Sequence, residues 1–405
     1  MFAEIALLIL SILALLLLWK EGLLKKKSAL FVSIALIAAG MILRGLCMDY
    51  ETLDYQNFLH VWVETYRQRG GFALLGKTIG NYNIPYNYFL ALFSYSSIRD
   101  LYLIKLLSIF FDLILDWGTL RLVRLFRSTA VAKLCGFFIP FFLPTVILNG
   151  ALWGQCDSIY VAFAVWALWA ALAGKPVRSV VFIALSFAFK MQAVFLMPFW
   201  LVLIFAKRVK WHHLAAFPIT YILTVLPAIL LGRPLKDALY VWQAGSIGSG
   251  LNYNSPSVFA FVRGSGNEQP LSYLGIIVAF VFLFLLFLFC WIERRRLDNH
   301  RLLLCAVLIC VAVPFFLPHM HDRYFFMADV LTTALAIVLP AMSLLPVCTL
   351  FASLLGYHAY LKMRYLLPMR CGAAALIAVI LALILCFCFR TPNCEKTVSR
   401  YNFDA

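Results

Sequence analysis

The chain has few charged residues for its length. Only 13% of its 405 residues are Asp, Glu, Lys or Arg, whereas 64% are hydrophobic and the mean hydropathy is +0.92. A soluble protein of this size needs far more polar residues to cover its surface. The shortage of charge therefore excludes a soluble globular fold and indicates that lipid surrounds much of the chain.

Acidic residues and paired cysteines are scarce as well. There are 34 Lys and Arg against 18 Asp and Glu, a net charge of +16, but the basic residues lie in short loops between apolar runs. Positive-inside topology and anionic lipid headgroups explain them better than nucleic acid, which we exclude as a partner. The eleven cysteines are scattered and no CxxC occurs, so they indicate small core residues and not a disulfide framework or metal site.

Long apolar runs are abundant. Backbone polar groups in hydrocarbon have no outside partner, so each run must be helical, and most runs reach bilayer length. The first run has no basic region before it and no small-x-small cleavage site after it, so we expect a retained helix. We predict an all-α polytopic membrane protein, one integral membrane domain over 1–405 with roughly 12–13 transmembrane helices, from runs at 1–19, 29–46, 101–126, 131–148, 157–174, 178–206, 214–231, 272–292, 302–317, 325–340, 346–361 and 371–389.

The basic loops predict the topology. Short loops rich in Lys and Arg belong on the cytoplasmic side, and here they are 20–27, 121–133, 174–178, 207–210 and 293–301. Alternation then puts the other loops on the outer side: the first long loop 47–100, the second long loop 232–271, and 149–157, 190–192 and 318–324. The basic stretch 362–370 also falls outside, so one late segment is either re-entrant or wrongly counted. An enzyme with an outer site cannot use cytoplasmic nucleotide-activated substrates and needs a lipid-linked donor.

The first long loop opens with carboxylates. Asp49, Glu51 and Asp54 follow a span directly, and a carboxylate at the interface can accept a proton from a hydroxyl as a general base. They are equally compatible with solvated loop residues or a helix cap. In NGALWGQCDSIY (149–160), Gln155 and Asp157 suit a sugar hydroxyl or the orientation of a base, although Asp157 could merely complement a helix N-terminus.

Other polar residues interrupt the outer ends of later spans. Lys190 is the lone basic residue of its turn, which fits either an anionic ligand or a lysine that snorkels to the interface. The Asn-rich turn with Asn252 and Asn254 is a weak signal, because such turns are common without function. Within the 101–126 run, Asp112 and Asp116 suggest a proton path, or acids neutralised by Lys105 or a nearby Arg.

LPHMHDRYFF (317–326) concentrates polar groups between two apolar runs. His319 and His321 form an HxH pair, but the other outer loops offer no matching ligand except His60, which argues against zinc. Arg323 and a histidine suit an oxyanion, because Arg can bind phosphate oxygens bidentately. An Asp322–Arg323 interfacial cap is the alternative.

Several of these stretches together resemble a known family. LDYQNFLHVW, GGFALL, YNIPYNYFL, WGQCDSIY, KMQA, NYNSPSVFAF and HMHDRYFF occur in this order. They resemble the bacterial relatives of the GPI mannosyltransferase PIG-V, within the GT-C superfamily of membrane glycosyltransferases, and the resemblance covers about 45 to 340. The usual family sequence runs MHERYF, so Asp322 replaces the more common Glu. The additional span at 1–19 departs from a minimal GT-C layout.

The resemblance implies an inverting transfer of a hexose, mannose or glucose, from a polyprenyl-phosphate donor to a lipid-linked or cell-surface glycan acceptor. It gives the role of catalytic base to Asp54, with Asp49 as second candidate. It places the donor phosphate at Lys190, Arg323 and the histidines His319 and His321. Sugar or acceptor contacts fall to Asp157, Gln155, Gln192, Tyr55, Asn252, Asn254 and Asp322.

The partners implied are thus the lipid-linked donor, a glycan or glycolipid acceptor and membrane lipids, in a bacterial cytoplasmic membrane with the site facing outside. No nucleotide is required, and a divalent metal is possible but not demanded. Two alternatives stay open. An O-antigen-type polymerase usually has arginine-rich outer loops, whereas 232–271 has only Arg233, Lys236 and Arg263. A lipid-glycan flippase predicts charges spread through the spans and repeated halves, and only Asp112 and Asp116 point that way.

Overall fold

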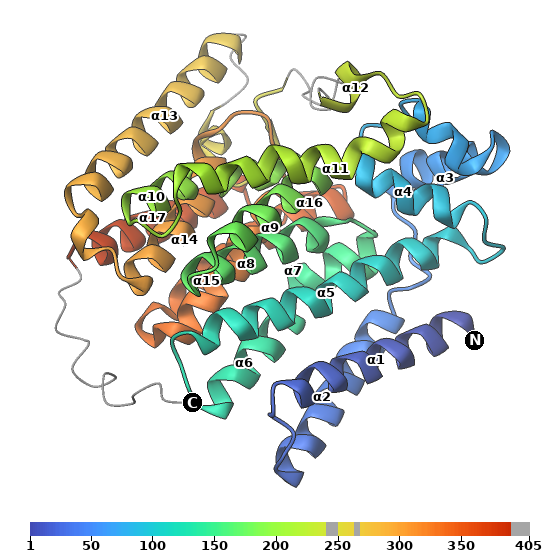
Figure 1. The fold of residues 1–405 in the computed structure, drawn as a ribbon, viewed down its shortest axis with the longest axis horizontal. Helices are drawn as coiled ribbons and strands as arrows, with labels where there is room; N and C mark the ends of the chain where they lie inside the picture. Colours follow the sequence, from blue (N-terminus) through green and yellow to red (C-terminus); the bar gives the residue numbers. More distant parts are fainter. Residues whose placement is uncertain (240–249, 263–267, 390–405) are drawn as a thin grey trace.

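The computed structural model describes residues 1–239, 250–262 and 268–389, and it is built almost entirely of helices (Figure 1). Where the described segments form short 3-10 or π turns, these are labelled η. The first half contains α1 (Phe2–Lys20), α2 (Lys27–Gly45), η1 (Tyr55–Leu59), α3 (His60–Gln68), η2 (Gly71–Gly76), α4 (Ile84–Phe93), α5 (Asp100–Arg124), α6 (Ala130–Phe141), α7 (Pro144–Ile147), η3 (Leu148–Trp153), α8 (Asp157–Leu172), α9 (Pro176–Phe189), η4 (Met191–Phe195) and α10 (Phe199–Phe205).

The second half adds a two-stranded parallel pairing to the helices. The strands are β1 (Asn252–Tyr253) and β2 (Met320–His321), with Tyr253 opposite His321. The other elements are η5 (Trp211–Ala215), α11 (Ala216–Leu230), α12 (Leu235–Leu239), η7 (Val258–Phe261), α13 (Glu268–Ile292), η8 (Arg294–Arg296), α14 (Asn299–Phe316), α15 (Phe326–Val338), η9 (Pro340–Met342), α16 (Leu344–Leu361) and α17 (Met369–Phe389).

The helices confirm the all-α polytopic membrane class. In the described residues, seven helices are long and apolar enough to cross a membrane, and a bent pair would make an eighth. The predicted 12–13 runs also include helices that do not meet this standard of length and composition. Four of the apolar helices have only 10–17 residues, and α5 carries Lys105, Asp112 and Asp116 within its apolar run.

Two predicted runs are broken by their own sequence. The 131–148 run bends by 45° between α6 and Pro144, where proline cannot continue a helix from the preceding turn. The 178–206 run turns at Lys190, whose extended backbone (φ −154°, ψ 131°) ends α9. Trp200 Nε1 in α10 donates to Ser179 Oγ in α9 at 3.0 Å, so this run is the predicted hairpin.

The core surrounds α8 and α14. Every residue of α8 except Phe163 and Trp166 is buried, including five alanines, and small residues allow membrane helices to approach closely. The N-terminal helices α1 and α2 lie at one edge (Figure 1) and share a separate apolar cluster with α5 and α6. The additional first span is therefore attached to the bundle through α5.

One end of the bundle collects the predicted outer loops. The Tyr55 hydroxyl in η1 donates to Asp100 Oδ1, at the start of α5, at 2.9 Å. The pairing of β1 with β2 ties 250–262 to 317–325, and the Tyr365 hydroxyl donates to Asn254 Oδ1 at 2.5 Å. The connection 362–368 therefore lies at this same end, as strict alternation requires. The second long loop, 232–271, lies in part outside the described residues, at 240–249 and 263–267.

Buried charges fix α2 against α5. The Arg44 guanidinium donates to Asp112 Oδ2 from Nε at 3.1 Å and from Nη2 at 3.0 Å, and both side chains are fully buried. Arg44 is thus the residue that neutralises Asp112. Lys105 is not: its ammonium donates to the backbone oxygens of Cys47, Met48 and Tyr50. It fixes the start of the first long loop, a role that its spacing from Asp112 in the sequence did not suggest.

Removal of the Arg44 charge is expected to destabilise the fold strongly. Arg44→Met would leave the Asp112 carboxylate buried without its cation, which typically costs about 3–5 kcal/mol. Thermal unfolding in detergent, followed by tryptophan fluorescence, should show a lower midpoint. The double variant Arg44→Met/Asp112→Asn removes both charges and should recover part of the loss. A single variant as stable as wild type would contradict the structural role.

Candidate active site

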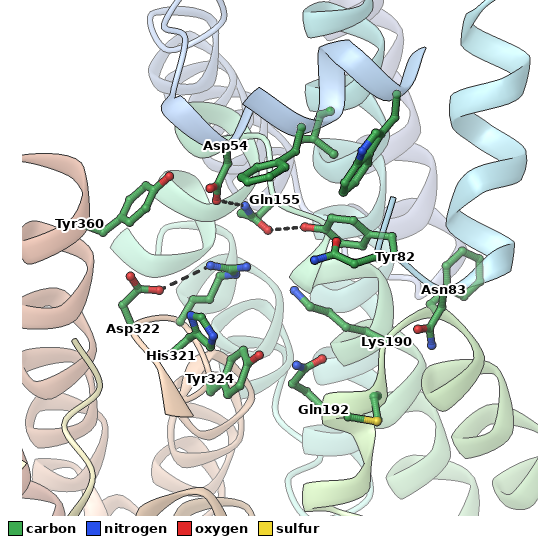
Figure 2. A pocket seen from close by; sticks show the side chains of 17 residues that line it. Asp54, Tyr82, Asn83, Gln155, Lys190, Gln192, His321, Asp322, Tyr324 and Tyr360 are labelled. Atoms are coloured by element: carbon green, nitrogen blue, oxygen red, sulfur yellow. Dashed lines mark hydrogen bonds and ion pairs between the residues drawn. The ribbon is translucent and has the colours of Figure 1, made fainter. Parts of the chain in front are cut away.

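A cavity of about 340 Å³ opens where the loops gather. Its walls come from segments far apart in the chain, and Figure 2 shows their side chains pointing toward a common space. The lining residues are Asp54, Phe58, Leu59, Trp62, Asn81, Tyr82, Asn83, Gln155, Phe189, Lys190, Met191, Gln192, His321, Asp322, Arg323, Tyr324 and Tyr360.

Asp54 provides the carboxylate on one wall. It directly precedes the π-helical turn η1, a backbone irregularity that is frequent at functional sites. Its Oδ2 accepts hydrogen bonds from Trp153 Nε1 at 2.9 Å and Gln155 Nε2 at 2.7 Å. The Tyr82 hydroxyl in turn donates to Gln155 Oε1 at 2.8 Å (Figure 2). This chain of contacts orients the carboxylate toward the cavity.

The turn before α8 brings Trp153 and Gln155 to Asp54. Gly154 adopts a left-handed conformation, φ 78°, which glycine tolerates at little cost. The turn lets the π-helical segment η3 end and α8 begin at Asp157. A residue with a Cβ at position 154 would strain the backbone between the two groups that contact the carboxylate.

Two cations of the cavity lining share one buried anion. Lys190 Nζ forms an ion pair with Asp157 Oδ1, and Arg323 Nε lies 3.7 Å from Asp157 Oδ2. Asn149 Nδ2 donates to the same Oδ2 at 2.7 Å. The Arg323 guanidinium also lies over the Trp153 ring, 5.3 Å from its centroid. Asp157 is buried and outside the cavity lining, so it holds the two cations in place from behind.

The cation of Arg323 is permanent. Burial alone would lower its pKa, but Tyr82 and the carboxylates of Asp322, Asp157 and Asp54 raise that pKa well above its usual range. His321 differs: burial, with Arg323 and Lys190 nearby, lowers its pKa to about 4. At neutral pH the imidazole is uncharged, so it can donate or accept a hydrogen bond but adds no charge.

The Asp322 carboxyl has a pKa near neutral pH. Burial raises its pKa to about 7, despite the opposing effect of Arg323, and Asp54 and Asp157 raise it further. Its Oδ1 lies 3.5 Å from Arg323 Nη1. The carboxyl therefore attracts the guanidinium more strongly when it is ionised.

The structure brings together seven of the predicted site residues around the cavity. They are Asp54, Gln155, Lys190, Gln192, His321, Asp322 and Arg323. Gln192 Oε1 is buried without a hydrogen-bond partner in the described residues, so it offers a free acceptor to a ligand hydroxyl.

The other predicted residues lie elsewhere. The Asp49 side chain is 80% exposed, accepts from Tyr102 and lies 3.7 Å from Arg99. Tyr55 is bound to Asp100, as described above. The Asn252 side chain forms two hydrogen bonds with the backbone of Ser255 in its own turn. Asn254 has a left-handed backbone, φ 56°, and its side chain accepts a hydrogen bond from the Tyr365 hydroxyl.

The two histidines of the HxH pair do not point toward a common site. His319 has a left-handed backbone, φ 61°, and its ring contacts the Gly250 carbonyl at 2.7 Å and Ser272 Oγ at 3.1 Å. His321 stacks on Tyr253, with ring centroids 4.7 Å apart. In the described residues no three His, Cys, Asp or Glu side chains gather as a metal site would require.

Several residues that contact the site were not singled out by sequence reasoning. Trp153 and Tyr82 belong to quoted motifs, and Tyr360 lies in a late span beside Asp54 (Figure 2). Trp62 packs edge-on against Tyr82, with centroids 5.4 Å apart. The closely spaced tyrosines of NYNIPYNY and the tryptophan of WGQ could have indicated these residues in the sequence. Aromatic residues are common at membrane interfaces, however, so the signal is not specific. Together the lining residues can accept a proton at Asp54 and hold an anion at Lys190 and Arg323.

Comparison with protein families finds one matching family model. The model described as Glycosyltransferase family 87 matches residues 82–314, more than half of the chain. The match includes Tyr82, Gln155, Asp157 and Lys190, whereas Asp54 precedes it and Arg323 follows it. No curated protein matches the chain.

Proposed function

Because the chain belongs to glycosyltransferase family 87, we propose that it moves a hexose from a polyprenyl-phosphate donor to a glycan or glycolipid hydroxyl. The membership and the apolar helices make the protein a membrane glycosyltransferase. The donor, the sugar (mannose or glucose), the acceptor and the outer-face location in a bacterial cytoplasmic membrane belong to the proposal. The closer relation to PIG-V is also part of the proposal.

One observation carries the proposal. A single cavity is lined by the Asp54 carboxylate and by the Lys190 and Arg323 cations. An inverting glycosyl transfer needs both groups, on opposite sides of the sugar, since the acceptor attacks C1 from the face opposite the leaving group. A phosphate leaving group develops charge that preorganised cations stabilise. The proposal requires no resident metal, because these side chains supply the positive charge.

The reaction then proceeds in one displacement. The acceptor hydroxyl donates its proton to Asp54 while its oxygen forms a bond to C1 of the sugar. The bond between C1 and the phosphate oxygen breaks, and its electron pair leaves with the polyprenyl phosphate, held by Arg323 and Lys190. Neutral His321 provides a hydrogen bond, and Gln192 accepts one from a sugar or acceptor hydroxyl. In this scheme Asp157 is a positioning residue, because it contacts both cations and lies outside the cavity lining.

Topology supports an outer-face site. The cavity end of the bundle carries the first long loop, whereas the short basic loops 121–133, 174–178 and 293–301 lie between the other ends of the helices. Basic loops favour the cytoplasmic side. A polyprenyl-phosphate sugar is the donor class available on the opposite side.

The test is transfer in proteoliposomes. Purified protein is given radiolabelled polyprenyl-phosphate mannose or glucose together with a lipid-glycan acceptor fraction. Labelled glycan supports the proposal. Absence of transfer from either donor, together with lipid scrambling, would instead support the flippase alternative, and chain elongation from a lipid-linked oligosaccharide would support the polymerase.

Donor use should weaken as the pH rises through about 7. Below this pH Asp322 is protonated and leaves Arg323 to the donor phosphate, which stays anionic throughout. Above it the ionised Asp322, whose pKa burial raises to about 7, competes for the guanidinium. The donor KM is expected to rise several-fold between pH 6 and 8, and Asp322→Asn should remove that rise. An unaltered pH dependence in this variant would exclude Asp322 as its source.

A further inference from the structure

A second recess lies at the opposite end of the bundle from the cavity. It is a groove of about 530 Å³ between α6, α15, η9 and α16. The helix α5 begins beside the catalytic loop and ends at Arg124, and α6 starts at Ala130 after a short connection. Because α5 has 25 residues, at 1.5 Å per residue the two ends lie about 37 Å apart. The groove therefore lies near the end of the bundle where α5 ends and α6 begins.

The groove has a polar mouth and an apolar depth. Arg127 and Ser343 line it just before α6 and α16 begin, and Ile139 and Leu350 line it farther along these helices. From Thr129 to Leu143 the helical rise gives a length of about 20 Å. A groove of this length extends from the membrane surface past the middle of a ~30 Å hydrocarbon core.

The groove faces the surrounding lipid, because Val131 and Val347 in its lining are 70% and 60% exposed. An acyl chain is narrow enough to lie in it, and its apolar surface matches the valine, isoleucine and leucine lining.

The residues at the mouth of the groove favour one class of lipid headgroup. The Arg127 side chain is exposed and, within the described residues, has no hydrogen-bond or ion-pair partner. The Ser343 hydroxyl lines the same mouth and can donate a hydrogen bond. Among the residues that the structure describes, no carboxylate lines the groove. A guanidinium free to bind two phosphate oxygens favours an anionic headgroup.

We propose that this groove is a binding site for one anionic phospholipid of the leaflet opposite the catalytic cavity, with its phosphate at Arg127 and an acyl chain between α6 and α16. The site is independent of the proposed transfer reaction and contains none of its residues.

The test measures retained lipid by native mass spectrometry. Full-length protein is delipidated and titrated with phosphatidylglycerol or phosphatidylcholine. Wild type should bind one phosphatidylglycerol more tightly than phosphatidylcholine, and Arg127→Gln should weaken phosphatidylglycerol binding about fivefold, as expected for one cation near the surface. Ala336→Trp fills the groove and should abolish this binding of either lipid.

Arg178→Gln is the matched control. Arg178 is another exposed arginine near the same end of the bundle, at the start of α9, but it lies outside the groove, so its loss should leave the affinity unchanged. Equal affinities of wild type for the two lipids, or unchanged phosphatidylglycerol binding in Arg127→Gln, would overturn the proposal. Circular dichroism and gel filtration verify that each variant is folded, and the Arg127 comparison stands if Ala336→Trp does not fold.

Discussion

Replacing Asp54 by Asn is expected to lower the rate of sugar transfer about 10²–10⁴-fold, the usual contribution of a general base. The amide oxygen of the substituted side chain can still accept the hydrogen bonds from Trp153 and Gln155, so the wall keeps its shape. The amide cannot take the acceptor proton. The measurement is kcat for radiolabelled transfer under saturating donor, with the thermal midpoint recorded to verify the fold.

Asp49→Asn is the control for this experiment. Asp49 is the other carboxylate that the sequence offered as a base, and its side chain is 80% exposed, beside Arg99. Its replacement should change kcat by less than about twofold, since an exposed ion pair contributes little. If Asp49→Asn abolished transfer while Asp54→Asn left it intact, the base would have been assigned to the wrong residue.

Arg323→Gln should lower kcat/KM for the donor about 10²–10³-fold, the loss typical for one charge-stabilising donor group. Gln can supply a hydrogen bond but no charge, and the guanidinium is the group held between Asp157, Asp322 and the Trp153 ring. The measurement is the initial rate of transfer over a range of donor concentrations. Arg323→Lys should recover only part of the loss, because an ammonium cannot bind two phosphate oxygens in parallel.

The matched control for this variant is Arg99→Gln. Arg99 is an arginine at the same end of the bundle, but it is 41% exposed and pairs with Glu51 outside the cavity. Donor kinetics should be unaffected by its loss. Equal effects of the two substitutions would mean that the general positive charge of this surface, and not the specific contact with Arg323, attracts the donor.

The sequence predicted the fold class because hydrophobicity is a property of each segment by itself. The runs at 101–126, 157–174 and 302–317 all appear as helices close to their predicted bounds. The break near Lys190 was also predicted, since a polar residue interrupts an apolar run there. The sequence did not predict the bend at Pro144 or the shortness of α8 and α15, because neither changes the local composition.

The site was harder to predict, because its residues are defined by partners far away in the chain. Lys190 was predicted to face an anionic ligand, and it does line the cavity, but its ion pair with Asp157 spans 33 residues. Asp157 resembled a ligand-binding residue and is instead buried behind the cations. His319 and His321 are alike in sequence, and only the left-handed backbone at His319 separates them. Tyr82 contacts Gln155 across 73 residues, and no local pattern encodes that contact.

The central claim is that Asp54 takes the acceptor proton, whereas Arg323 and Lys190 bind the donor phosphate in the same cavity. Equilibrium binding of a radiolabelled polyprenyl-phosphate hexose to wild type, Asp54→Asn and Arg323→Gln tests it most directly. The account predicts that Asp54→Asn binds the donor within about twofold of wild type, although it does not turn over, whereas Arg323→Gln loses affinity about 10²-fold, the scale of one charged contact. Donor binding that is lost in Asp54→Asn or retained in Arg323→Gln would contradict it.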